Sequence, residues 1–187
     1  MSKAELLEIA KPLICNKEVA KSFVDGVKTQ TRRLPKDNGT RYKKGDILWI
    51  REPARIEFTF VRDGINMMDY RYLSDSGGTH RSKIPKKHLL KRWMVNNKGV
   101  PNGCIKEMAR MFYRVIDVQY EKLNEMPHTY VSYEAEGIAF EDENGVPKLL
   151  DDMLQDWRTL WNSTAPKGRK WEDNPLVEVY QLEKINI

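Results

Sequence analysis

The sequence predicts an α+β protein in which a small mixed β-barrel is flanked by helices. Segments of strand length, either continuously apolar or alternating, outnumber the three segments with helical spacing. Turns rich in glycine, asparagine and lysine separate these segments. A chain of 187 residues can bury a substantial core, so we expect a single domain over residues 1–187 that carries an insertion at about 53–104.

The first elements are a helix, a turn and a strand. Residues 16–25 predict a short helix that Asn16 caps and Gly26 ends. The turn at 42–46 leads into residues 47–50, a short apolar run typical of a buried strand.

A hairpin follows over residues 56–72, with its turn at Asp63-Gly64. Apolar residues alternate with other residues before the turn, at Ile56, Phe58 and Phe60. Residues 73–104 show little order in their pattern, because glycine and asparagine pairs interrupt them.

The second half predicts a strand over 111–118, a helix over 127–136 that Gly137 ends, and a final alternating strand over 176–182. Between the last two lies an apolar stripe at helical spacing, and its tryptophans are expected to pack in the core. The stripe consists of Leu149, Leu150, Met153, Leu154, Trp157, Leu160 and Trp161.

The segment from Gly26 to Arg33 carries most of the functional information. It reads Gly-Val-Lys-Thr-Gln-Thr-Arg-Arg, so that hydroxyl groups lie among cations in a composition suited to phosphate or to a polar base edge. The segment lacks the glycine spacing of the phosphate-binding loop of nucleotide hydrolases. The alternative interpretation is an exposed basic strand that binds no ligand.

Positive charge is concentrated in one part of the chain. The protein has a net charge of +5, whereas residues 53–104 alone have ten Lys or Arg against four Asp or Glu, a net charge of +6. Six of these cations lie between Arg81 and Arg92 without any acid, and Trp93 follows them. Counterion release would attract a polyanion such as nucleic acid to this stretch. The alternative is a solvated loop whose lysines only keep the protein soluble.

The sequence favours no metal, cofactor or membrane. Cys15 and Cys104 are far apart and neither they nor the three histidines have the spacing of metal ligands, so we expect reduced thiols and no metal site. No run of about 18 apolar residues and no signal peptide are present, which favours a cytoplasmic location.

Several motifs, taken in order, resemble the ASCH family of the PUA-like superfamily, especially its bacteriophage-encoded members. The motifs span roughly Leu13 to Ile185, and they are residues 26–33 described above, KGDILWIRE at 44–52, KEMAR at 106–110, AEGI at 135–138, LWNS at 160–163 and WEDNP at 171–175. This resemblance implies a compact PUA-like β-barrel with a cleft beside the first helix and the lysine–threonine segment. For a phage-encoded protein the cytoplasm is that of the host bacterium.

The resemblance implies binding of nucleic acid, with RNA favoured, or of a modified nucleoside. Our first hypothesis is therefore a protein that recognises a base or phosphate in the cleft, with no cofactor. The expected cleft residues are Lys28, Thr31, Arg32, Arg51, Arg110 and Glu136, and Thr29 and Arg33 are also expected to bind nucleic acid. The insertion would add non-specific affinity through Lys83, Lys86, Lys87, Lys91, Arg92 and Trp93.

Two alternatives remain open. One small bacterial ASCH type hydrolyses acetylated cytidine with a lysine, a threonine and a glutamate, and by motif these roles fall on Lys28, Thr31 and Glu136. In that chemistry a lysine held partly neutral by burial takes a proton from the threonine or a water, and the glutamate orients the lysine or passes a proton to the departing amine. In a regular strand positions 28 and 31 point to opposite faces, so this site requires a turn or bulge. The other alternative is a phage protein that uses the fold as a scaffold to act on a host or virion protein.

Overall fold

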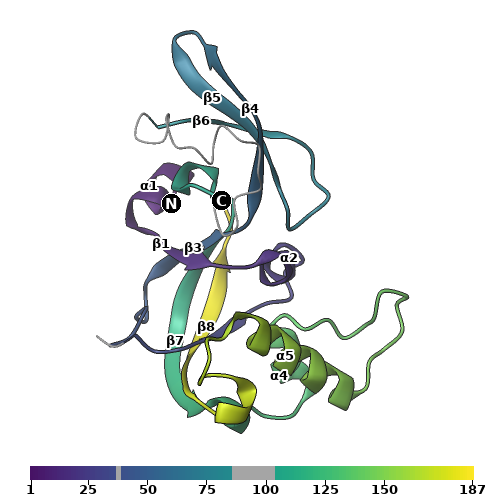
Figure 1. Ribbon diagram of the computed structural model, residues 1–187. Helices are drawn as coiled ribbons and strands as arrows, with labels where there is room; N and C mark the ends of the chain where they lie inside the picture. Colours follow the sequence, from purple (N-terminus) through teal and green to yellow (C-terminus); the bar gives the residue numbers. More distant parts are fainter. Residues whose placement is uncertain (37–38, 86–103) are drawn as a thin grey trace. The chain divides into compact units, whose positions relative to one another are not determined.

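The structure is a computed structural model that describes residues 1–36, 39–85 and 104–187. It is an α+β fold with two β-sheets, of five and three strands, and its described residues include four α-helices (Figure 1). The predicted α+β class is therefore confirmed. The pairing of the described strands does not close into a barrel.

The chain forms two compact units, which we call unit 1 and unit 2. Unit 1 comprises residues 1–24, 47–112 and 185–187, and unit 2 comprises residues 25–46 and 113–184. In the five-stranded sheet, β1 and β3 belong to unit 1, whereas β7, β8 and β2 lie side by side in that order and belong almost entirely to unit 2.

Unit 1 begins with a short helix and a parallel strand pair. Helix α1 (Lys3–Ile9) starts at a capping box, in which Ser2 accepts from the Glu5 amide and Glu5 accepts from the Ser2 amide. Strand β1 (Lys11–Ile14) pairs in parallel with β3 (Ile47–Arg51), the strand predicted after the turn. The pattern of the sequence does not predict α1 or β1.

Helix α2 (Lys17–Val24) confirms the helix expected over residues 16–25. Asn16 Oδ1 accepts a hydrogen bond of 2.9 Å from the Val19 amide, which satisfies one of the free donors of the first turn. Gly26 follows with φ of 76°, a left-handed conformation that glycine adopts without strain.

The predicted hairpin is confirmed as β4 (Ala54–Arg62) and β5 (Ile65–Tyr72), joined at Asp63-Gly64. Both turn residues have positive φ, which matches the twist of the two strands. A short third strand, β6 (His80–Lys83), pairs antiparallel with β5 and completes the three-stranded sheet (Figure 1). The sequence pattern does not predict β6, because the strand lies between glycines and a basic stretch.

A β-bulge in β4 decides which of its side chains reach the core. The register shifts between Ile56 and Phe58, so Glu57 is an extra residue on its strand. Ile56 is 1% exposed and packs with Met68 and Tyr70, whereas Phe58 is 68% exposed. The regular alternation expected for Ile56 and Phe58 is therefore wrong at this point.

Unit 2 is built on three strands. These are β7 (Phe112–Lys122), β8 (Leu176–Ile185) and β2 (Gln30–Arg33), and the first two confirm the strands expected from 111 and 176 onward. Strand β2 pairs antiparallel with β8, so that Thr31 lies opposite Tyr180. This pairing connects the Gly26–Arg33 segment to the last strand of the protein.

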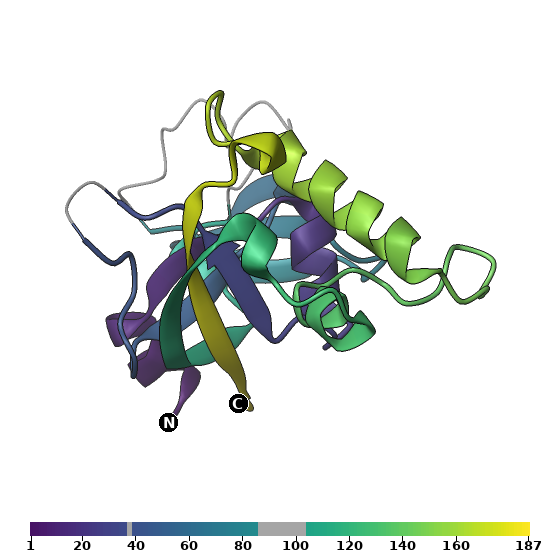
Figure 2. The ribbon, with the colours of Figure 1, turned by 90° about the horizontal axis from the view of Figure 1, so that it is seen from below.

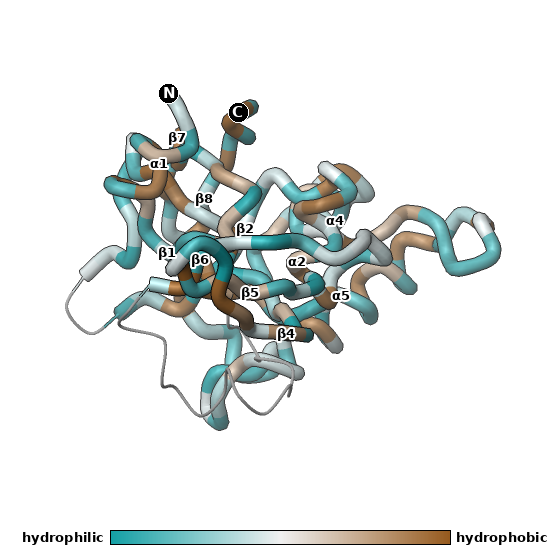
Figure 3. The backbone as a smooth tube through the Cα atoms, turned by 90° about the horizontal axis from the view of Figure 1, so that it is seen from above, coloured by the Kyte–Doolittle hydropathy of each residue, from teal (hydrophilic) through white to brown (hydrophobic). Residues whose placement is uncertain are grey.

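Helices α4 (Tyr130–Ala135) and α5 (Leu150–Thr164) complete unit 2, with the 3-10 helix η4 (Trp171–Asp173) beside α5 (Figure 2). Hydrophobic and hydrophilic residues alternate along α5 (Figure 3), as expected for a helix with one buried face. Met153, Trp157 and Trp161 are buried against Val177 and Val179 of β8, which confirms the predicted packing of the tryptophans. Leu149 is an exception, because it precedes the helix and is exposed.

Candidate functional site

The backbone of unit 2 brings the Gly26–Arg33 segment next to the end of α4. Residues 27–29 precede β2 and are not part of the strand. The Thr29 amide donates to the Ala135 carbonyl oxygen over 3.1 Å, and the Thr29 carbonyl oxygen accepts from the Leu182 amide over 2.8 Å. Thr29 is therefore held between β8 and α4, and its neighbour Lys28 lies close to Glu136, the residue that ends α4.

Lys28 and Glu136 are in direct contact. Lys28 Nζ donates to Glu136 Oε2 over 2.9 Å and also to the Glu136 carbonyl oxygen. Arg32 Nη1 donates to the other carboxylate oxygen, Glu136 Oε1, over 2.6 Å. The side chains of all three residues are at most 2% exposed. One buried carboxylate thus holds two buried cations.

Two further side chains complete this arrangement, which we call the Glu136 cluster (Lys28, Gln30, Arg32, Glu121 and Glu136). Arg32 Nε donates to Glu121 Oε1 and Arg32 Nη1 donates to Gln30 Oε1, each over 2.8 Å. The two cations and two carboxylates balance in charge, as buried ionic groups require. Glu136 is accordingly not the exposed acid that its place near a helix end suggests, because it is needed to neutralise Lys28 and Arg32.

Thr31 is buried in β2 beside Arg32 and on the opposite side of the strand. Strand alternation places the two side chains on opposite faces of the sheet, with Arg33 on the same face as Thr31. The hydrogen bonds to the Glu136 carboxylate described above come from Lys28 and Arg32. Lys28 and Glu136 therefore contact each other directly, and Thr31 does not bridge them.

The face of the sheet that bears Thr31 carries a second buried carboxylate, which the sequence pattern does not identify. Glu178 of β8 is fully buried and accepts from the Arg41 amide over 3.3 Å, from the Tyr120 hydroxyl over 3.4 Å and from the Tyr180 hydroxyl. Burial and the bond to Glu178 raise the pKa of Tyr180. Glu178 lies between two valines, so its pattern alone indicates an outward-facing residue.

Arg110, predicted to bind nucleic acid, makes an internal network in unit 1. Its Nε and Nη2 donate to the two oxygens of Glu52, each over 2.9 Å, and its Nη1 donates to Asp75 over 2.5 Å. The guanidinium carbon also lies 3.8 Å from the ring centre of Tyr72. Burial acts to raise the pKa of Asp75, but the hydrogen bonds from Arg110 and the Gly77 amide outweigh it and lower that pKa. These contacts occupy the guanidinium, which keeps few donors for a ligand.

Arg51, the two cysteines and the described part of the basic stretch lie in unit 1. Arg51 is half-buried, and its Nε has no hydrogen-bond partner among the described residues. Both cysteines are buried thiols outside any disulfide, and burial raises the pKa of the Cys104 thiol to about 12. Of the predicted basic stretch, Lys83 is exposed on β6, whereas Lys86, Lys87, Lys91, Arg92 and Trp93 lie outside the described residues.

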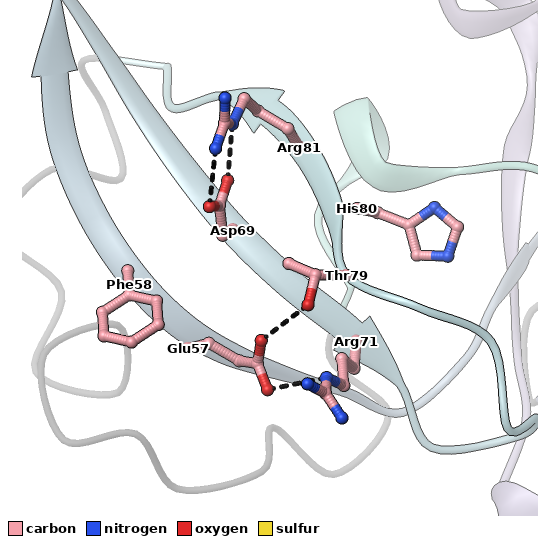
Figure 4. Close-up of a pocket in the computed structure, with 7 residues that line it drawn as sticks. All are labelled: Glu57, Phe58, Asp69, Arg71, Thr79, His80 and Arg81. Atoms are coloured by element: carbon pink, nitrogen blue, oxygen red, sulfur yellow. Dashed lines mark hydrogen bonds and ion pairs between the residues drawn. The ribbon is translucent and has the colours of Figure 1, made fainter.

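A pocket of about 470 Å³ opens on the three-stranded sheet (Figure 4). Two ion pairs cross it: Arg81 donates through Nε and Nη2 to Asp69 over 2.7 and 2.9 Å, and Arg71 Nε lies 2.8 Å from Glu57. The bond from Arg81 lowers the pKa of Asp69. The lining residues are Glu57, Phe58, Asp69, Arg71, Thr79, His80 and Arg81.

Across residues 1–36, 39–85 and 104–187, no three His, Cys, Asp or Glu side chains gather in a way that could hold a metal ion. Within the same ranges no helix has the length and apolar character needed to cross a membrane. The chain matches no protein-family model, no curated protein and no solved structure. Its function is therefore inferred from the chemistry of the sites described above.

Proposed function

We propose that this protein binds nucleic acid, with RNA favoured, or a modified nucleoside, as an ASCH-type protein of the PUA-like superfamily. The observation that carries the proposal is the contact between Lys28 and Glu136, two buried residues separated by 108 positions. The resemblance to the ASCH family implies the same two residues as members of one site. The barrel of the PUA-like fold is part of the same proposal.

The Glu136 cluster has the chemistry to recognise the edge of a nucleobase. A carboxylate accepts from an exocyclic amine such as N4 of cytosine, and lysine and arginine donate to ring carbonyls or ring nitrogens. In the cluster, Glu136 supplies the acceptor and Lys28 and Arg32 supply the donors, in a setting where low polarity strengthens each hydrogen bond. A base that enters replaces part of this internal pairing with equivalent bonds of its own.

A second candidate function is hydrolysis of an acylated cytidine, because the same contact brings together the lysine and the glutamate of that alternative. In that reaction water adds to the acyl carbonyl, the carbon–nitrogen bond breaks, and a carboxylic acid and cytidine leave. The reaction needs Lys28 as a base, yet a carboxylate 2.9 Å away favours the charged ammonium. It also needs Thr31, which lies on the other face of β2 from Arg32. We therefore place binding first.

The test incubates purified protein with acetylcytidine and with cytidine, and measures binding by calorimetry and products by chromatography. We expect binding that weakens in Glu136→Gln and in Gln30→Ala, without release of acetate. Gln30→Ala removes one member of the cluster but no charge, so it tests the site even where Glu136→Gln unfolds the protein. Glu143→Gln, at an exposed position of the same unit, is the matched control.

The outcomes separate the three hypotheses. Release of acetate that both variants abolish would favour the hydrolase. Absence of binding to either nucleoside and to single-stranded RNA at low salt would refute the proposal and leave a protein partner as the remaining hypothesis. For RNA, affinity must fall steeply as the salt concentration rises, because phosphate contacts release counterions.

A further inference from the structure

The three-stranded sheet has an outer face that the core does not cover. The inner face of β5 carries Met68, Tyr70 and Tyr72, all buried. The alternate residues of β5 therefore point outward, and the strand register places them in rows with residues of β4 and β6. One row is Phe58–Asp69–Arg81 and the next is Phe60–Met67–Lys83. We call these two rows, together with Glu57 and Arg71, the outer face.

An aromatic ring on this face is exposed to solvent. Phe58 is 68% exposed, although a phenylalanine is among the residues most often buried. The bulge at Glu57 produces this exposure, because it turns Phe58 away from the core that Ile56 enters. Bulges recur next to functional sites, where they re-aim a side chain. The strand thus departs from regular geometry in a way that presents Phe58 to solvent.

Two arginines line the same pocket as Phe58, and nearby acids orient them. Arg71 and Arg81 are half exposed, and each forms an ion pair with one acid of the face, Glu57 and Asp69 respectively. In each arginine the pairing leaves part of the guanidinium without a hydrogen bond to any described residue. Arg81 also lies 4.9 Å from the ring centre of Phe60, which adds a cation–π contact.

Positive charge dominates this side of the sheet. By register and alternation, five exposed cations project from it against two acids, Glu57 and Asp69, and Asp63 of the hairpin turn lies 3.8 Å from one of these cations, Arg62. The cations are Arg55, Arg62, Arg71, Arg81 and Lys83. A polyanion complements this charge, and an exposed aromatic ring among cations is the arrangement on which unpaired bases stack.

We propose that the outer face binds single-stranded nucleic acid, with one base stacked on Phe58 and the adjoining phosphates bound by Arg71 and Arg81. The pocket seen in Figure 4 lies between these side chains, and its volume of about 470 Å³ falls within the usual range for small-ligand sites. Bases in a duplex are already stacked and cannot lie on Phe58, which excludes double-stranded ligands from this contact. The inference rests on the proposed function, and it proposes a second binding site in addition to the Glu136 cluster.

The test titrates fluorescein-labelled single strands of RNA and of DNA, both of the same pyrimidine-rich sequence, with the full-length protein. Loss of one stacked base weakens binding by roughly 5- to 150-fold, which is the expected effect of Phe58→Ala on one or both strands. Arg81→Gln should lower the slope of log affinity against log salt by about 0.7, the value for one phosphate contact on a single strand. Val61→Ala is the matched control, because Val61 is as exposed as Phe58 but projects from the other face of β4.

Each result has a defined meaning. The proposal is overturned where Phe58→Ala binds like the wild type, where Val61→Ala weakens binding equally, or where the wild type binds neither strand at low salt. A change in elution volume of Phe58→Ala on size exclusion would also overturn it, since the face would then be a contact between copies of the chain. Binding of cytidine and acetylcytidine should be unchanged in Phe58→Ala, so failure here is distinguishable from failure of the Glu136 cluster.

Discussion

Replacing Glu136 by glutamine removes the carboxylate that neutralises both Lys28 and Arg32. The two ion pairs have lengths of 2.9 and 2.6 Å between side chains that are nearly inaccessible to solvent. Arg32 keeps its pair with Glu121, whereas Lys28 exchanges a carboxylate for a neutral amide and keeps the carbonyl oxygen of residue 136. Removal of one charged partner from a buried pair of this kind costs about 3–5 kcal/mol. We expect Glu136→Gln to lower the free energy of unfolding by that amount.

The free energy of unfolding is measured by equilibrium unfolding in urea. Tryptophan fluorescence monitors the transition, because Trp157 and Trp161 are buried in the same unit as Glu136. Glu143→Gln carries the same chemical change at an exposed position and should stay within about 0.5 kcal/mol of the wild type. If the dependence of the free energy on urea concentration is unchanged, the shift in the midpoint urea concentration gives the difference in the free energy of unfolding.

A second substitution identifies the cause of the loss. Lys28→Met in the Glu136→Gln background removes the buried ammonium and leaves Arg32 paired with Glu121. The double variant should regain a large part of the lost stability, with a coupling energy of about 1–3 kcal/mol. A Glu136→Gln protein within about 1 kcal/mol of the wild type, or a double variant less stable than the single one, would refute this account of the cluster.

Two further predictions concern the core and the pH dependence of stability. Trp157→Ala should lower the free energy of unfolding in urea by about 3–5 kcal/mol, because the ring is buried against β8. Leu149→Ala, at an exposed site, should change it little. Equal unfolding midpoints for the two variants would place the apolar stripe outside the core. The pKa of Asp75 is lowered in the folded state, so its pair with Arg110 stabilises the protein above the ordinary carboxyl pKa and is lost as the pH falls through the lower folded value. Asp75→Asn should therefore reduce stability at pH 7 and flatten its decline below about pH 4. Parallel pH curves for the two proteins would show that Asp75 does not contribute.

Local patterns in the sequence are sufficient for most of the elements. Asn16 and Gly26 delimit α2, and Asp63-Gly64 forms the hairpin turn, because each of these residues acts through its own backbone and its nearest neighbours. The helical stripe of α5 is likewise visible, since an amphipathic helix repeats its apolar residues at a fixed spacing. Short elements such as α1, β1 and β6 escape prediction, because four to seven residues carry too little periodicity to separate a strand or helix from a loop.

The candidate sites depend on contacts that no local pattern contains. The order of residues shows where the charged groups lie along the chain, and the resemblance only implies that Lys28 and Glu136 belong to one site. Arg32 is also expected in the cleft, but only the fold pairs it with Glu136 and adds Glu121 as its further partner, because these groups meet across strands and a helix end. The same holds for Phe58. Its exposure follows from a one-residue bulge, and a shift of one residue in strand register moves a side chain from the core to the surface.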